Sequence, residues 1–348
     1  MNWQKFYLKN MIKNKDIYII AEIGVNHNNN MSLAKQLIKI AKKIGANAVK
    51  FQTFKAETLA KKETPKVPYQ KKSGSKNETH HDMLKKLELS EKNHRMLKNY
   101  CDIQKIEFIS TPYDLNSAIF LNKLGVKTFK VASADIVDHQ LHNFLASTGK
   151  KVIISTGMSL MKEIEDVIKI YKKFKNKKYS LLHCVSNYPC SDKSLNLKNI
   201  LTLKKKFRCE VGFSDHSVGN QASIVSIGYG ATIIEKHFTK SKSLDGPDHL
   251  ASSTPKEFQS LVSDLRRTKN MLGSNNRKIQ KEEIIMRKIS RKSMIYNKDL
   301  EKGYKIKNSD INLIRPGTGL LGDKIKFFLN KKLKRNVKKY QNITYKDV

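Results

Sequence analysis

The sequence EVGFSDHSVGNQASIVSIGYGATIIEKH, residues 210–237, contains one complete unit of the fold. It begins with a short β-type run at 210–214, continues with a helical pattern at 221–229 and ends with a second β-type run at 231–237. A strand, a helix and a strand in this order form two parallel strands joined by a crossover helix. The unit therefore predicts a parallel sheet that is covered by helices.

The same alternation extends outward from this unit and begins at Ile17. Eight such units over about 250 residues predict a TIM (β/α)8 barrel, whose active site lies at the carboxyl ends of the strands. A doubly wound open sheet is the alternative, although it does not need eight strands. The other predicted strands are 17–23, 47–52, 106–110, 126–132, 151–155 and 179–184. The other predicted helices of the barrel are 32–44, 91–104, 115–124, 160–171 and 197–206.

The connection at 53–90 is much longer than an ordinary loop between a strand and a helix. It carries Pro65, Pro68 and Gly74 before a short helical pattern at 83–87. Long connections on the catalytic face of a barrel are typical of lids and substrate loops. A disordered insertion is the alternative.

A change in composition marks the end of the barrel. A helix runs from Pro255 to Leu272, and the breaker residues Gly273-Ser-Asn-Asn276 end it. We expect a catalytic domain at 1–272, a charged linker at 273–288 and a small β-containing domain at 289–348. A domain of about 60 residues is marginal alone, so it is expected to need a partner surface.

The net charge of +37 would suit a nucleic-acid partner. The excess is carried by lysines spread over every segment, and no RNP-like or finger-like motif accompanies them. We therefore expect a solvated lysine-rich surface and no specific nucleic-acid partner. No apolar run approaches the roughly 18–20 residues of a membrane span. We therefore expect no signal peptide and a cytoplasmic protein that does not bind membranes. The four cysteines show no metal-ligand or redox spacing, and their sparseness indicates a reducing compartment.

Two histidines mark the carboxyl ends of neighbouring predicted strands. Side chains alternate along a strand, so Ser214 and His216 share one face, as do Glu235 and His237. Polar residues follow the other predicted strands in the same way. They are Glu22, Lys50, Gln52, Thr111, Lys130, Ser133, Asp135, Ser155 and Tyr188.

These residue types indicate a specific chemistry. Lysines and hydroxyls suit a small anion that carries phosphate and carboxylate groups. Two imidazoles suit a divalent transition ion, whose open positions would go to water, Glu235 or substrate. Together they predict a metal-assisted reaction on a phosphate ester or an enol phosphate. Taken singly, a lysine at a strand end is often a solvated rim residue, and a single histidine is often only packed.

Nine short motifs stand at or near the ends of the predicted strands. They are Ala21–His27 (AEIGVNH), Val49–Thr53 (VKFQT), Ser110–Tyr113 (STPY), Phe129–Ser133 (FKVAS), Ser155–Met158 (STGM), His183–Cys184 (HC), Gly212–His216 (GFSDH), Glu235–Thr239 (EKHFT) and Gly246–His249 (GPDH). With these motifs the sequence strongly resembles the sialic acid synthase family. That family condenses phosphoenolpyruvate with an N-acetylated hexosamine aldehyde to make a nine-carbon 2-keto acid.

The resemblance also implies an architecture. The barrel would be followed by an antifreeze-like (SAF) domain, here from about Arg291 to Val348. In the family two chains exchange these domains in a homodimer, and each small domain caps the active site of the partner. Arg315 would then reach across the dimer to the sugar.

Carried over by resemblance, the site residues fall into four groups. The phosphoenolpyruvate contacts would be Lys50, Thr111, Lys130, Ser133, Ser155 and Ser214. The sugar contacts would be Gln52, Tyr188, Asp248 and Arg315. His216 and His237 would hold Mn²⁺ or Mg²⁺, which would polarise the aldehyde oxygen as a Lewis acid. Lys50 and Lys130 would neutralise the donor, and Glu22 or Asp135 would steer the attacking water or move its proton.

Three departures from the common family pattern concern the details of the site. Asn28-Asn-Asn30 stands where a glycine often follows His-Asn, and Asp135 stands where many bacterial members have Glu. Ser186-Asn187 replaces a common Asn-Ile before Tyr188, which leaves the acceptor open.

N-acetylneuraminate synthase, acting on N-acetylmannosamine, is the first hypothesis for the function. The 6-phosphate of that sugar and the 2,4-diacetamido-6-deoxy acceptors of legionaminate and pseudaminate synthases are alternatives. A non-catalytic polysaccharide-associated or RNA-binding protein, and a metal-dependent aldolase, are more distant ones.

Overall fold

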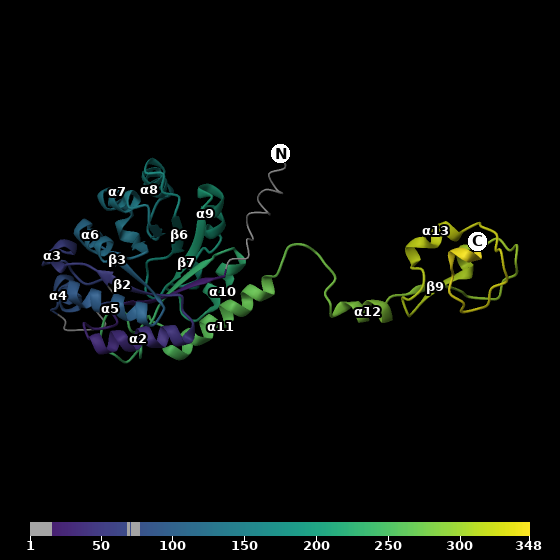
Figure 1. The fold of residues 1–348 in the computed structure, drawn as a ribbon, viewed down its shortest axis with the longest axis horizontal. Coiled ribbons are helices and arrows are strands. Elements are labelled where there is room, and N and C mark those ends of the chain that lie inside the picture. The colour runs from purple at the N-terminus through teal and green to yellow at the C-terminus, as the bar shows by residue number, and fades with distance from the viewer. Residues whose placement is uncertain (1–15, 68–69, 71–76) are drawn as a thin grey trace. The chain divides into compact units, whose positions relative to one another are not determined.

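The computed structural model describes residues 16–67, 70 and 77–348. The chain divides into two compact units, Met1–Gly273 and Ser274–Val348, which are described separately below (Figure 1). None of the described helices has the length and the apolar composition that a membrane crossing requires. All four cysteines are free thiols.

The first unit is a closed barrel of eight parallel strands, as the sequence predicts. The strands pair in chain order, and β8 pairs with β1 to close the barrel. Their bounds are β1 (Tyr18–Gly24), β2 (Ala48–Thr53), β3 (Glu107–Pro112), β4 (Thr128–Val131), β5 (Lys151–Ser155), β6 (Tyr179–Cys184), β7 (Glu210–Asp215) and β8 (Ile233–His237).

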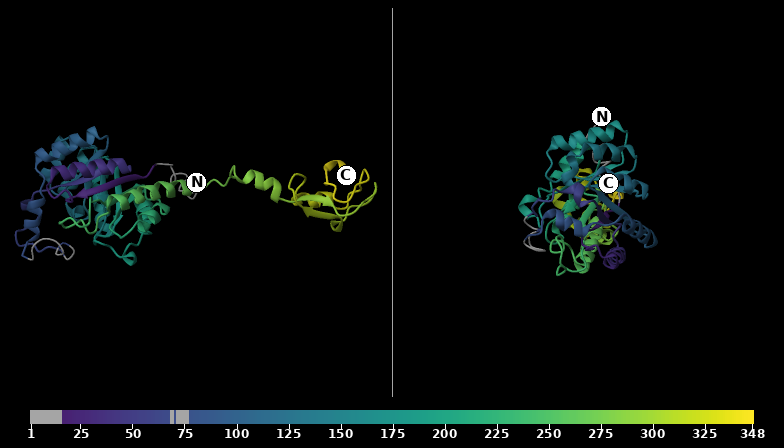
Figure 2. Two further views of the ribbon diagram at one scale, coloured as in Figure 1. Left: turned by 90° about the horizontal axis from the view of Figure 1, so that it is seen from below. Right: turned by 90° about the vertical axis from the view of Figure 1, so that its left-hand side faces the viewer.

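Helices surround the barrel and follow its strands (Figures 1 and 2). They are α2 (Met31–Ile44), α5 (Glu91–Ile103), α6 (Leu115–Lys123), α7 (His139–Ser147), α8 (Met161–Lys173), α9 (Asn199–Phe207), α10 (Gln221–Gly228) and α11 (Pro255–Leu272). In α2 the Asn30 side chain caps the first turn, and Gly45 ends the helix in the left-handed conformation. The sequence-based prediction omits α7, whose first turn is capped by Asp138.

The barrel interior is filled by an apolar layer at mid-height. Its buried members are Ile20, Ala48, Ile109, Ile153, Leu182 and Ile233. Gly212 occupies the corresponding position of β7. A side chain does not fit there, because its Cβ would lie 2.3 Å from the carbonyl oxygen of Ile233. The next residue on the same face of each of these strands lies two positions further along. Those residues are Glu22, Lys50, Thr111, Ser155, Cys184, Ser214 and Glu235. A polar layer therefore rests directly on the apolar one.

The long connection after β2 folds into two short helices, α3 (Ala56–Leu59) and α4 (His80–Leu87). Met83, Leu84 and Leu87 of α4 form a small apolar cluster with Val25 and Phe54. A capping box between Thr79 and Asp82 begins α4. Part of the predicted lid, including Pro68 and Gly74, lies outside the described residues. The described part of the connection is therefore a packed structure, and its role as a lid stays a prediction.

The second unit has a core of its own. Helix α12 (Glu283–Ser290) precedes the antiparallel strands β9 (Ser293–Tyr296) and β10 (Ile311–Ile314), and α13 (Ile325–Phe328) follows them. Its buried apolar side chains are Met294, Tyr296, Leu300, Ile306, Phe328, Leu333, Val337 and Ile343. The unit thus contains the small β-sheet that the sequence predicts.

Candidate active site

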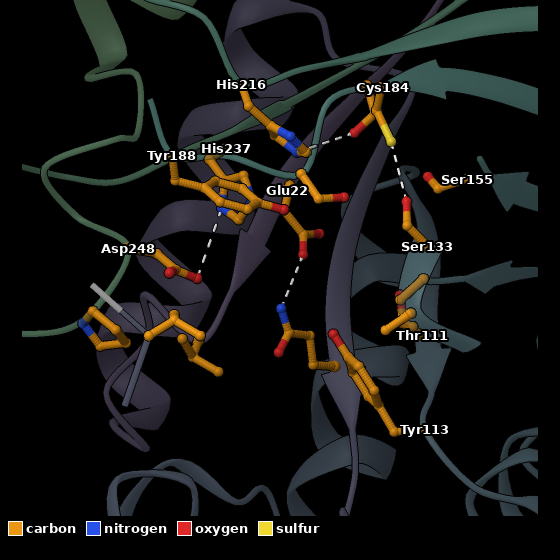
Figure 3. A pocket seen from close by; sticks show the side chains of 18 of the residues that line it. Glu22, Thr111, Tyr113, Ser133, Ser155, Cys184, Tyr188, His216, His237 and Asp248 are labelled. Atoms are coloured by element: carbon orange, nitrogen blue, oxygen red, sulfur yellow. Dashed lines mark hydrogen bonds and ion pairs between the residues drawn. The ribbon is translucent and has the colours of Figure 1, made fainter. Parts of the chain in front are cut away.

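A pocket of about 570 Å³ opens at the carboxyl ends of the barrel strands (Figure 3). Each of the eight strands contributes to its lining. The lining includes every predicted site residue of the first unit. They are Glu22, Lys50, Gln52, Thr111, Lys130, Ser133, Asp135, Ser155, Tyr188, Ser214, His216, His237 and Asp248.

Two lysine ammonium groups form the floor of the pocket. Lys50 Nζ lies 2.9 Å from Glu22 Oε2, 3.7 Å from Glu235 Oε2 and 3.3 Å from the hydroxyl of Thr111. All these side chains are buried. Because buried charges need partners, the two carboxylates hold the ammonium of Lys50 in a fixed position.

Lys130 is the second buried cation of the floor. Its Nζ donates to Ser155 Oγ at 2.7 Å and lies 3.8 Å from Glu235 Oε1. Ser214 donates to the same Glu235 oxygen at 2.9 Å. Lys50 of β2, Lys130 of β4 and the Ser214 hydroxyl of β7 therefore surround Glu235 of β8.

The two acidic residues of the floor differ in their protonation. Burial raises the pKa of Glu22, and the opposing effect of Lys50 is too small to offset it. Burial also acts to raise the pKa of Glu235, but Lys130 and Lys50 outweigh it and hold that pKa below its usual range. Glu22 therefore binds a proton more readily than Glu235 does. Glu235 is the carboxylate that balances the charge of the two lysines.

His216 and His237 lie side by side at the pocket, with their ring centroids 5.8 Å apart. His216 Nδ1 donates to the carbonyl oxygen of Val185 at 2.7 Å. A carbonyl oxygen only accepts, so Nε2 of His216 presents a lone pair. Burial lowers the pKa of both rings, to about 4 for His216. Tyr188 packs against His216 at a centroid distance of 4.1 Å.

This arrangement fits two ligands of a divalent metal ion. The pKa of each imidazole lies below its usual range, and the hydrogen bond to the Val185 carbonyl fixes the orientation of the His216 ring. His237 Nδ1 and Glu235 Oε2 are buried without a hydrogen bond. Within the described residues, no group of three or more His, Cys, Asp or Glu side chains is arranged to hold a metal ion. The protein therefore offers two nitrogen ligands, and water or substrate would have to complete the set.

The predicted sugar contacts of the first unit lie around the mouth of the pocket. Gln52 donates to Glu22 Oε1 at 3.3 Å, and Asp248 Oδ2 lies 3.9 Å from His237 Nδ1. The loop that carries Asp248 is fixed to the loop after β1. Asn26 donates to Ser252 Oγ at 2.8 Å, and Ser252 donates to the carbonyl oxygen of Asp248 at 2.6 Å.

Asp135 and Ser133 line the pocket from the turn after β4. Burial raises the pKa of Asp135 to about 7, and the neighbouring Asp138 adds to the shift. Ser133 Oγ accepts from the backbone N–H of Gly157 at 3.0 Å and lies 3.1 Å from Cys184 Sγ. Asp135 can therefore take up or release a proton near neutral pH.

Some lining residues are absent from the predicted set. Cys184 could have been found, because it is two positions beyond the buried Leu182 on the same face of β6. Leu59, Met83 and Leu84 carry no such signal, because they lie in the long connection after β2.

Arg315 belongs to the second unit, where its side chain is exposed. It is the one predicted site residue that the first unit does not contain. Its role toward the sugar stays a prediction.

Comparison with known proteins identifies the family. The profile of the NeuB family matches residues 37–277. The N,N'-diacetyllegionaminic acid synthase of Legionella pneumophila is 43% identical over 324 residues, which cover 92% of this chain and 91% of that protein. The N,N'-diacetyllegionaminic acid synthase of Campylobacter jejuni is 39% identical, over 93% of this chain and 98% of that protein.

A solved structure agrees with these relatives. The N-acetylneuraminic acid (sialic acid) synthetase from Leptospira borgpetersenii has a TM-score of 0.70 and 35% identity, over 78% of this chain and 90% of that one. The resemblance drawn from the sequence motifs is therefore confirmed, and the chain belongs to the NeuB family.

Proposed function

We propose that this chain is a nonulosonic (sialic) acid synthase, a transferase that joins phosphoenolpyruvate to the open-chain aldehyde of an N-acetylmannosamine-type sugar and releases phosphate. One observation carries the proposal. Two buried ammonium groups, Lys50 and Lys130, share a pocket with two neutral histidines, His216 and His237. The names of the relatives, which are synthases of sialic-acid-type sugars, support the same reaction.

Phosphoenolpyruvate presents two anionic groups, a phosphate and a carboxylate. Lys50 and Lys130 supply one cation for each, and the surrounding hydroxyls supply neutral donors. Those hydroxyls belong to Thr111, Ser133, Ser155 and Ser214. In a buried site such fixed donors stabilise charge more strongly than water does. Glu22 and Glu235 keep the ammonium groups in position before the donor enters.

The reaction forms one bond between carbons and breaks one bond between carbon and oxygen. The π electrons of the enol attack the aldehyde carbon, whose oxygen takes a proton and becomes a hydroxyl. Water adds to the oxocarbenium carbon that results and loses a proton. The carbon–oxygen bond to phosphate then breaks, and phosphate leaves with its bridging oxygen. The hydroxyl that came from water gives its proton to the phosphate and becomes the carbonyl of the 2-keto acid. Asp135 and Glu22 are the acids that would move these protons, because burial raises the pKa of each toward neutrality.

The proposal includes Mn²⁺ or Mg²⁺ held by His216 and His237. A bound ion of this kind would act as a Lewis acid on the aldehyde oxygen. The lone pair of His216 Nε2 and the absence of a hydrogen bond at His237 Nδ1 support this assignment. The Val185 carbonyl would keep the His216 ring in its ligating orientation.

The sugar would bind at the mouth of the pocket, to Gln52, Tyr188 and Asp248. The family resemblance adds Arg315 of a second chain in a domain-swapped homodimer. N-acetylneuraminate synthase is the first candidate. N,N'-diacetyllegionaminate synthase is the second, which has the support of two enzymes of that name at 43% and 39% identity.

The test is phosphate release from phosphoenolpyruvate with purified protein and a panel of sugars. The panel holds N-acetylmannosamine, its 6-phosphate and the 2,4-diacetamido-6-deoxy acceptors, each with and without Mn²⁺. We expect release with at least one sugar and none with phosphoenolpyruvate alone. Turnover of pyruvate in place of phosphoenolpyruvate would indicate an aldolase, and turnover of neither would contradict the proposal.

A further inference from the structure

A second cavity lies at the other end of the barrel from the active-site pocket. It has a volume of about 890 Å³, within the range of about 300–1,000 Å³ that is usual for small-molecule sites. Its lining includes the first residues of β5, β6 and β7 and the turns that lead into β6, β7 and β8. In a parallel barrel these amino ends of the strands lie opposite the carboxyl ends that carry Lys50 and His216. This space is called the basic cavity below.

Cationic side chains dominate the lining of the basic cavity. Six of them are lysines, and Arg208 is the seventh cation. The lysines are Lys151, Lys172, Lys175, Lys177, Lys178 and Lys204. Among the described lining residues Glu210 is the one carboxylate. The chain as a whole has 68 lysines and arginines to 31 acidic residues. The ratio of seven to one therefore exceeds what the lysine-rich composition alone would give.

The carboxylate of Glu210 is held by neighbouring donors at the base of the cavity. Its Oε2 accepts from the buried Ser180 hydroxyl at 2.9 Å, and its Oε1 accepts from the Thr232 hydroxyl at 3.1 Å. Lys151 Nζ lies 3.7 Å from Oε2. One carboxylate balances one unit of charge, so six positive charges in excess face the basic cavity.

Lys204 of α9 is the half-buried cation of this group. Its Nζ donates to the carbonyl oxygen of Gly230 at 2.9 Å. Gly230 has a φ of +86°, and a Cβ at this position would lie 2.4 Å from the same nitrogen. Burial lowers the pKa of Lys204, which means that its ammonium group has lost part of its hydration. An ammonium group has three N–H donors, so an oxygen of a bound anion can replace the lost water.

The turn between α8 and β6 supplies four exposed cations, Lys172, Lys175, Lys177 and Lys178. None of the ion pairs among the described residues involves any of the four. Like charges so close in the chain repel one another. The macrodipole of α8 favours a cation in its last turn, where Lys172 lies, but the other three lie beyond the end of the helix. A bound anion would relieve this repulsion.

We infer that the basic cavity is a second binding site, which takes a small anion with a chain of phosphate groups. A single phosphate carries at most about two negative charges, so a chain of phosphates matches the excess of six better. Inorganic polyphosphate and nucleoside triphosphates share this chemistry. A concave site favours a small ligand over the broad surface of a nucleic acid. The inference is independent of the proposed function, because the two sites lie at opposite ends of the barrel.

The test is calorimetric titration of the metal-free protein with tripolyphosphate and with ATP, at about 0.15 M salt to screen distant charges. Lys172→Glu/Lys178→Glu replaces two attractive charges of the cavity with repulsive ones. We expect this double variant to bind both anions about tenfold more weakly or worse than the wild type. If it fails to fold, Lys172→Gln/Lys178→Gln removes the same two cations without adding negative charge.

Two controls separate the cavity from the general charge and from the active site. Lys173→Glu/Lys205→Glu changes the net charge by the same amount at exposed positions that do not line the cavity. Its affinity should stay within about twofold of the wild type, because salt screens these charges. Lys50→Met removes a cation from the floor of the active-site pocket and should retain tripolyphosphate binding in the basic cavity.

The outcomes divide clearly. Stronger binding of ATP than of tripolyphosphate would identify a nucleotide site, and the reverse would identify a site for inorganic polyphosphate. An equal loss of affinity in both glutamate double variants would overturn the inference, because the net charge would then attract the anion. Binding lost in Lys50→Met but kept in Lys172→Glu/Lys178→Glu would also overturn it. Tighter binding of a short single-stranded RNA than of either anion would replace the small ligand by a nucleic acid.

Discussion

Lys50 and Glu22 stand in register on neighbouring strands, and their charged groups lie 2.9 Å apart beneath the pocket. An anion that enters the pocket therefore competes with Glu22 for the same ammonium group. Because burial raises the pKa of Glu22, this carboxyl can take up a proton and leave the ammonium to the ligand. Glu235 remains charged and keeps Lys50 and Lys130 in place.

Lys50→Met should strongly weaken donor binding. We expect kcat/KM for phosphoenolpyruvate to fall about 100- to 1,000-fold, because one of two cations that face the anion is lost. Calorimetric titration with phosphoenolpyruvate measures the binding directly. Lys236→Met is the matched control, since Lys236 is equally buried and pairs with Asp215 at 2.9 Å outside the pocket. Both variants should lose stability. Donor binding that survives in Lys50→Met would contradict the assignment.

His216→Ala and His237→Ala should each weaken Mn²⁺ binding by roughly 100-fold, because each removes one of two nitrogen ligands. Electron paramagnetic resonance of Mn²⁺ titrated into the protein reports the ion without any need for turnover. His142→Gln is the control, because His142 is fully buried beside Tyr171 and does not line the pocket. Equal Mn²⁺ affinity in all three variants and the wild type would show that the histidine pair is not a metal site.

Arg315→Ala should lose activity, and the loss should be recoverable across the dimer. We expect coexpressed Arg315→Ala and Lys50→Met chains to regain about one quarter of wild-type activity. Half of the dimers would be mixed, and each mixed dimer would contain one site with both residues intact. Separately purified variants, mixed without subunit exchange, provide the baseline. No recovery in confirmed mixed dimers would mean that Arg315 acts on its own chain or on neither.

Asp135→Asn should stabilise the protein at alkaline pH. The folded-state pKa of Asp135 is about 7, raised from an ordinary value of 3.8, so ionisation opposes folding as pH rises between these values. The gain in unfolding free energy should be about 1–3 kcal/mol at pH 8 and vanish below about pH 4. Urea denaturation at several pH values measures it. Asp138→Ala instead removes the cap of α7 and should destabilise the protein throughout this range. If the difference in unfolding free energy between Asp135→Asn and the wild type did not vary with pH, this explanation would be refuted.

Much of the fold and of the floor follows from the sequence, because both depend on the two-residue period of strands. Once Ile233 is placed in the barrel interior, Glu235 and His237 must follow on the same face. Helix α2 can also be predicted from the sequence, because the residues that begin and end it, Asn30 and Gly45, are its direct neighbours in the chain.

Other features depend on contacts between distant segments. Val25 and Met83 meet in one cluster although 58 positions separate them, and no local pattern in the long connection indicates this contact. The sequence-based prediction omits helix α7 because only nine residues, HQLHNFLAS, carry its pattern, although Leu141, Phe144 and Leu145 have helical spacing. In the structure its Leu141 and Leu145 are nonetheless fully buried.

The two kinds of pocket lining come from different parts of the chain. Leu59, Met83, Leu84 and Leu87 belong to one connection between β2 and β3, whereas the charged floor comes from the barrel strands themselves. Changes within that single connection can alter the lining of the pocket without disturbing the charges of its floor. The two parts of the lining can therefore change independently of each other.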